Sequence, residues 1–67
     1  MKNKAVYVDT IPKGVLVKIK PAKGNALRKR LFPSMGQALA YVQTKENDSI
    51  PAFINGNPTI IKAWGLN

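Results

Sequence analysis

The sequence predicts a small α+β domain in which one α-helix packs against an antiparallel β-sheet of about four to five strands, in the order β-β-β-α-β-β. Three observations indicate this fold class. Short runs of β-branched and aliphatic residues recur between turn residues in the first half of the chain. A segment with helical spacing of apolar residues follows, and an Asn-Gly pair lies between two apolar runs near the end. A chain of 67 residues has room for one domain, residues 1–67.

The first half of the chain carries three strand segments separated by turns. The run "AVYV" at 5–8 predicts the first strand, and "TIPKG" at 10–14 predicts a turn because it contains Pro and Gly. The segment "VLVKIK" at 15–20 alternates apolar and polar residues, which is typical of a half-buried strand. "PAKGN" at 21–25 predicts a second turn, after which "ALRKRLF" at 26–32 continues as a paired strand.

A helix is expected from Ser34 to about Lys45. Ser34 is a favourable N-cap residue, and Gln37 lies three residues later, as in a capping box. Gly36 is less favourable than Ala inside a helix by about 1 kcal/mol. Four apolar residues at helical spacing form one stripe that can face a sheet: Met35, Ala38, Leu39 and Val42.

Residues 50–64 leave two structures open, a β-hairpin or helices. The Asn-Gly pair at 55–56 predicts a hairpin, because a type I′ turn needs positive φ at both central residues. The Asn-Pro pair at 57–58 also fits the N-cap and first position of a helix. The β-branched run at 59–61 favours the hairpin. Trp64 is expected to pack in the core or to close a sheet edge.

The residue types argue against catalysis and against metal binding. The chain has no Cys and no His, so it lacks the usual zinc ligands, the common general base and the strongest nucleophile. Of the three carboxylates, Glu46 and Asp48 share one polar turn, and that pair is a poor metal site. The sequence also has no P-loop glycine pattern. We therefore expect a non-enzymatic protein with no metal and no cofactor.

The charge balance predicts a polyanionic partner. The net charge is +8, and residues 15–32 hold six of the eleven Lys and Arg residues with no Asp or Glu. Nucleic acid, either DNA or RNA, is the expected partner. The alternative is a small inhibitor, of the kind phages encode, that docks its basic face on an acidic patch of a host protein. A solvated lysine-rich strand that prevents edge-to-edge aggregation is a third explanation.

Location, source and assembly follow from the same features. No apolar run is long enough for a membrane span or for the core of a signal peptide, so we expect a cytoplasmic protein that does not bind membranes. The chain starts at Met1 and has the character of a complete small protein encoded by a phage or mobile element. Exposed strand edges in a chain this short are compatible with a homodimer.

Strand alternation predicts where the positive charge lies. If the apolar residues of the second and third strands are buried together (Val17, Ile19, Leu27 and Leu31), four cations share the opposite face: Lys18, Lys20, Arg28 and Arg30. Lys13 and Lys23 then lie in the turns at the two ends of this hairpin, and Lys29 falls on the apolar face. Tyr7 joins the basic face if Val6 and Val8 point inward, where it either stacks on a base or is a partly buried core residue. The predicted nucleic-acid contacts are therefore Tyr7, Lys13, Lys18, Lys20, Lys23, Arg28, Lys29 and Arg30.

A basic three-stranded sheet followed by a helix, with "RKRLFPSMGQALAYV" at the junction, resembles the DNA-binding domains of AP2-type transcription factors and of some phage integrases. The resemblance covers about residues 15–42 and rests on the order of elements. It implies a sheet that enters the DNA major groove. It assigns no role to an individual residue, and the last third of the chain has no counterpart in it.

Overall fold

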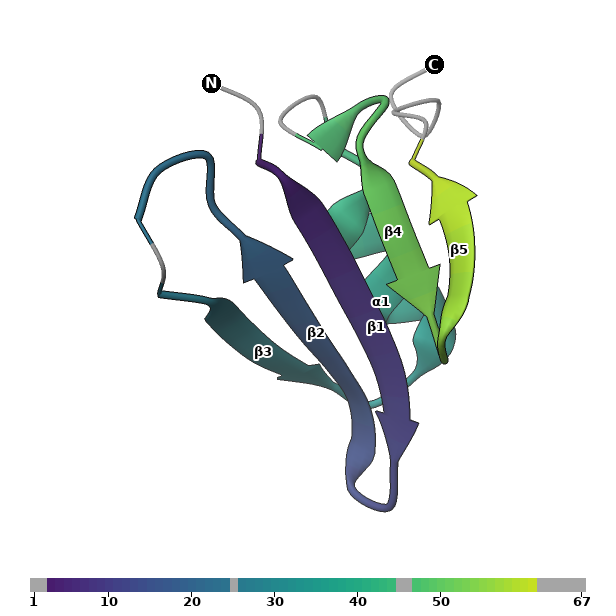
Figure 1. Cartoon of the computed structure of the whole chain (residues 1–67). Helices are drawn as coiled ribbons and strands as arrows, with labels where there is room; N and C mark the ends of the chain where they lie inside the picture. The colour runs from purple at the N-terminus through teal and green to yellow at the C-terminus, as the bar shows by residue number, and fades with distance from the viewer. Residues whose placement is uncertain (1–2, 25, 45–46, 62–67) are drawn as a thin grey trace.

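A mixed five-stranded sheet carries one helix on one of its faces (Figure 1). This arrangement comes from a computed structural model that describes residues 3–24, 26–44 and 47–61. The elements follow the predicted order β-β-β-α-β-β: β1 (Ala5–Ile11), β2 (Gly14–Lys20), β3 (Arg28–Phe32), α1 (Met35–Val42), β4 (Pro51–Ile54) and β5 (Asn57–Ile60). The predicted α+β fold class is confirmed.

The strand order across the sheet is β3-β2-β1-β4-β5. The neighbours β1–β2, β2–β3 and β4–β5 are antiparallel, but β1 and β4 are parallel. The prediction of a purely antiparallel sheet is therefore wrong. The chain leaves β3 at one edge, crosses one face of the sheet through α1, and returns as β4 on the far side of β1. A parallel neighbour requires such a long crossover, which is usually helical.

Local sequence signals set the bounds of α1. Ser34 has the extended backbone of an N-cap, with φ −146° and ψ 159°, and its Oγ accepts a hydrogen bond from Gln37 N at 3.4 Å. At the other end, Gln43 N donates to Leu39 O, and the buried Asn47 donates from Nδ2 to Val42 O at 2.9 Å. This side chain satisfies a carbonyl that the ending helix leaves free. The predicted start is confirmed, the helix ends at Val42, and Lys45 lies outside the described residues.

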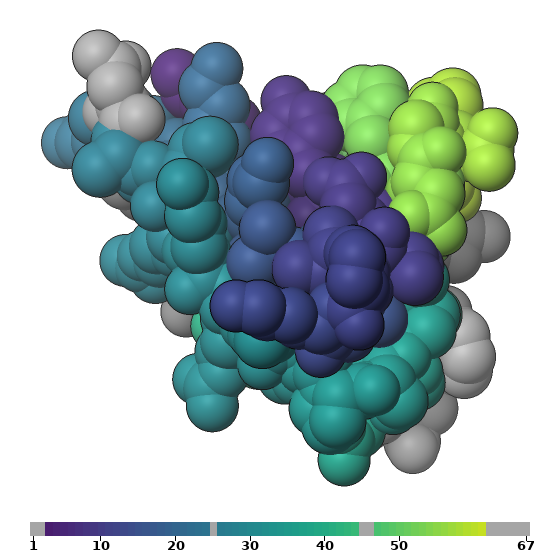
Figure 2. Space-filling model, turned by 90° about the horizontal axis from the view of Figure 1, so that it is seen from below, coloured from purple at the N-terminus to yellow at the C-terminus, as the bar shows by residue number. Residues whose placement is uncertain are grey.

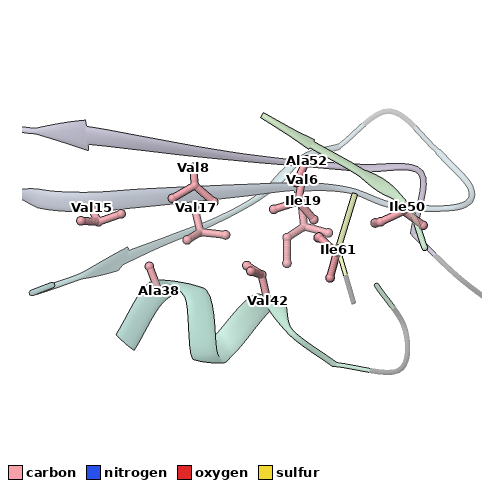
Figure 3. Packing of buried hydrophobic residues seen from close by; sticks show 10 residues of the cluster. All are labelled: Val6, Val8, Val15, Val17, Ile19, Ala38, Val42, Ile50, Ala52 and Ile61. Atoms are coloured by element: carbon pink, nitrogen blue, oxygen red, sulfur yellow. The ribbon is translucent and has the colours of Figure 1, made fainter. Parts of the chain in front are cut away.

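The core lies between α1 and the face of the sheet that α1 covers (Figure 3). Val6, Val8 and Val17 are fully buried, and Ala38 and Val42 of α1 point toward them. The alternation in β1 and β2 places every second side chain in this layer. The strands therefore present the residues between these valines, Tyr7 and Lys18 among them, on the opposite face.

The molecule has two layers when it is viewed along the strands from the β1–β2 turn. Figure 2 shows β1, in purple, and the β4–β5 hairpin, in green to yellow-green, across the upper part and α1, in teal-green, below them. The described part of the chain places no helix on the other side of the sheet. We call the side of the sheet opposite α1 the open face. Figure 1 looks onto this face, with α1 behind the strands.

The β4–β5 hairpin is the one predicted from the Asn-Gly pair. Asn55 has φ 49° and Gly56 has φ 86°, the two positive values that a type I′ turn requires. The hairpin confirms the favoured structure for residues 51–60, while Trp64 lies outside the described residues. Asn55 also ties the turn to β1, because its Oδ1 accepts from Thr10 N at 2.8 Å and its backbone N donates to Val8 O at 2.8 Å.

Replacing Asn55 by alanine is expected to lower the free energy of unfolding by about 2 kcal/mol. About half comes from the lost bonds to Thr10 N and Thr10 Oγ1, and the rest from placing an alanine at positive φ. Asn55→Asp is the matched control, since aspartate tolerates the turn, keeps the oxygen that accepts from Thr10 N and loses only the 3.3 Å bond to Thr10 Oγ1. Urea unfolding of the three proteins measures the difference. Equal stabilities of Asn55→Ala and the parent would contradict the role of this side chain.

Candidate nucleic-acid interface

The register of β3 places its cations differently from the prediction. Arg30 pairs with Val17 and Arg28 with Ile19, so both arginines lie on the α1 side of the sheet. Lys29 pairs with Lys18, which lies on the open face. The prediction that Lys18, Lys20, Arg28 and Arg30 share one face is therefore wrong, as is the placement of Lys29 on the apolar face. Leu27 and Leu31, predicted to be buried, are 40% and 49% exposed.

Phe32 explains this register. Its side chain lies on the same side of the sheet as those of Arg28 and Arg30. Its ring packs on Tyr41 of α1 with the ring centroids 5.0 Å apart. The chain enters α1 directly after β3, so an aromatic ring at this end of the strand has the helix beside it. The guanidinium of Arg30 lies 5.6 Å from the ring centroid of Phe32 and 5.2 Å from that of Tyr41. Because β3 is an edge strand, both arginines remain exposed although their side chains lie on the same side of the sheet as the core residues.

One row of side chains crosses the whole open face. Directly paired residues of neighbouring strands share a face, and the pairings run without a break from β3 to β5. The row consists of Lys29, Lys18, Tyr7, Phe53 and Pro58. We call these five residues the central row. Two cations lie at its β3 end, two aromatic rings lie at the centre, and a proline lies at the β5 end.

The two aromatic rings of the central row form a stacked pair. The centroids of Tyr7 and Phe53 are 5.4 Å apart, and their planes differ by 13°. Tyr7 is half-buried and points away from the core, with Val6 and Val8 inward, which is the geometry that its predicted role required. Phe53 is not among the contacts predicted from the sequence. The alternation in "AFI" indicates its direction. Ala52 and Ile54 point toward the core, so Phe53 between them points to the open face.

Three lysines flank this pair on the open face. Lys18 and Lys20 lie on β2, and Lys29 lies on β3 beside Lys18. An open depression of about 460 Å³ runs along this region, lined by Tyr7, Asp9, Lys18, Lys20 and Leu27. The directly opposed lysines, Lys18 and Lys29, repel each other and destabilise the strand pair by roughly 0.5 kcal/mol. A bound polyanion removes that repulsion, whereas a solvated strand retains it.

The other predicted contacts are not gathered at this surface. Lys13 is exposed in the turn between β1 and β2, at one end of the sheet. Lys23 is exposed in the loop between β2 and β3, beyond the other end of β2. Arg28 and Arg30 are exposed on the α1 side. Of the eight predicted residues, the register therefore brings together four: Tyr7, Lys18, Lys20 and Lys29.

Among residues 3–24, 26–44 and 47–61, His, Cys, Asp and Glu side chains form no group of three suited to a metal ion. Within the same ranges, no helix has the length and apolar character needed to cross a bilayer.

Comparisons with known proteins assign no relatives. No family model, no curated protein and no solved structure matches this chain. The resemblance of the sheet-plus-helix order to AP2-type and integrase domains therefore rests on the element order alone.

Proposed function

We propose that the protein is a non-enzymatic nucleic-acid-binding protein that contacts its ligand through the open face of the sheet. Lys18, Lys20 and Lys29 contact phosphates, and Tyr7 with Phe53 contacts bases. This proposal keeps the class of partner that the charge predicts and moves the contact surface from the hairpin arginines to the open face. The expected phage or mobile-element source stays a prediction.

The observation that carries the proposal is the composition of the central row. Lysines supply the charge that phosphates require, and aromatic rings supply flat apolar surface for bases. A surface that served only to keep the protein soluble would not require two stacked aromatic rings beside a pair of opposed lysines. An acidic protein partner accounts for the lysines through charge complementarity and can also bury aromatic rings, so the control polyanion in the test below separates the two partners.

The test is fluorescence anisotropy with labelled DNA and RNA at about 50 and 200 mM salt. Three lysine–phosphate contacts on a single strand predict a slope of log K against log salt near −2. The corresponding slope for Lys20→Ala is expected to be shallower by about 0.7, because one contact is lost. A polyglutamate peptide of equal charge is the control polyanion. Equal affinity for polyglutamate and nucleic acid would favour the acidic-protein alternative.

A further inference from the structure

We propose that the open face selects single-stranded over double-stranded nucleic acid, with unpaired bases stacked on the outer faces of the Tyr7–Phe53 ring pair. The inference rests on the proposed function and specifies the form of the ligand. It is drawn from three features: the aromatic pair, the width of the sheet and the separation of the lysines from the rings.

The aromatic pair is suited to unpaired bases. Tyr7 and Phe53 lie on the two central strands, β1 and β4, whose direct pairing holds the rings 5.4 Å apart. Both are half-buried, so their positions are supported by neighbouring residues. Every base has a flat π-face, and stacking on such rings is the main base contact in proteins that bind single strands. In a duplex these faces are already stacked on one another and only base edges are accessible.

The width of the sheet opposes insertion into a duplex groove. Five strands have four spacings of about 4.8 Å, so the central row spans about 19 Å. The major groove of B-DNA is only about 12 Å wide and admits a helix or a two-stranded ribbon. A three-stranded sheet, as in the domains that the element order resembles, spans about 10 Å. The two strands β4 and β5 therefore make this open face too wide to lie flat in the groove.

The positions of the lysines relative to the aromatic rings determine how a bound single strand would lie on the sheet. Lys18 and Lys20 lie two residues apart on β2, roughly 6.7 Å along the strand, with Lys29 beside Lys18. The rings lie on β1 and β4, to one side of this line. A single strand that runs along β2 has its phosphates over the lysines and turns its bases across β1 and β4. A duplex holds its bases inside and cannot adopt this arrangement.

The experiment compares single-stranded DNA, single-stranded RNA and duplex DNA of equal length, with Tyr7→Leu, Phe53→Leu and the double variant. Wild-type protein is expected to bind single strands at least about 10-fold more tightly than duplex. Each leucine is expected to weaken single-strand binding by about 10-fold, since stacking of one base contributes that much. Duplex binding is expected to change by less than about threefold. Tyr7→Phe is the matched control, because it keeps an aromatic ring beside Phe53 and is expected to retain single-strand binding.

A second measurement does not depend on the variants folding. An oligonucleotide with 2-aminopurine reports stacking through its fluorescence, and wild-type protein is expected to change that signal on binding. Failure of every nucleic acid to bind would overturn the proposed function itself. Duplex bound as tightly as single strands, unchanged affinity of the folded leucine variants, or binding with no change in 2-aminopurine fluorescence would overturn only the single-strand inference.

Discussion

Gly14→Ala is expected to lower the free energy of unfolding by at least about 3 kcal/mol, a large fraction of the total stability of a domain of this size. Gly14 is the first residue of β2, directly after the β1–β2 turn, and pairs with Ile11. Two independent constraints act on it. Its φ is +143°, a conformation that residues with a side chain rarely adopt. A Cβ built on Gly14 also meets a backbone atom at very short range.

The steric constraint is the more severe of the two. A Cβ at position 14 would overlap Phe32 O, a backbone oxygen of the neighbouring edge strand. A flexible side chain can move aside, but this carbonyl belongs to the last residue of β3, directly before the turn into α1. Relief of the contact therefore requires β2 and β3 to separate at this end. The lysine pair Lys18–Lys29 belongs to the same strand pairing, so the binding face depends on this glycine.

Gly36→Ala is the matched control for this substitution. Gly36 lies in the first turn of α1, and a Cβ there has nothing within 4 Å. Alanine favours helix by up to about 1 kcal/mol relative to glycine, so this variant is expected to melt a few degrees higher. Gly14→Ala is expected to melt at least about 15 °C lower, if it folds. Thermal melts by circular dichroism measure both, and a Gly14→Ala melting temperature near that of the parent would contradict the proposed strand contact.

Reversing two charges on the open face is expected to weaken single-strand binding by at least about 100-fold. The variant is Lys18→Glu with Lys29→Glu. Two charge-assisted phosphate contacts contribute about 3 kcal/mol together, which corresponds to roughly two powers of ten in affinity. The substitution keeps a like-charged pair across β2 and β3, so that cross-strand repulsion is retained. It also places a carboxylate at position 18 diagonal to Asp9, which is expected to lower the stability by a few tenths of a kcal/mol, so thermal melts accompany the binding curves.

The matched control reverses Arg28 and Arg30 on the α1 side of the same edge strand. Each reversal changes the charge by two, so both double variants go from +8 to +4 and lose the same long-range attraction. The difference between them therefore isolates direct contact. Arg30→Glu also removes a cation–π contact with Phe32 and Tyr41, which contributes about 0.5–1 kcal/mol, so melts accompany the binding curves. A larger loss of affinity from the arginine pair would contradict the open face as the contact surface and assign that surface to the α1 side.

Local signals in the sequence were sufficient for most elements. Ser34 and Gln37 marked the start of the helix, and the Asn-Gly pair at 55–56 marked a hairpin whose φ values match a type I′ turn. The alternation in "VLVKIK" identified the inward valines and the outward lysines of β2. Each of these signals depends on a few neighbouring residues, so no knowledge of the rest of the fold is needed. The expected positions of Tyr7, Lys18 and Lys20 followed from them.

Only the tertiary structure decided the parity of β3 and the neighbours of β1. In the segment at 26–32, which contains β3, two leucines at odd positions compete with one phenylalanine at an even position. The strand turns the even positions toward α1 because Phe32 packs on Tyr41. In an edge strand, exposed leucines and arginines beside a helix cost little free energy. The sequence of β3 alone therefore does not determine which of its side chains face α1. The parallel pairing of β1 with β4 joins residues more than forty positions apart, and it alone brings Phe53 beside Tyr7. By itself the sequence therefore determined the elements and the abundance of positive charge, whereas long-range packing decided which cations and which rings share a face.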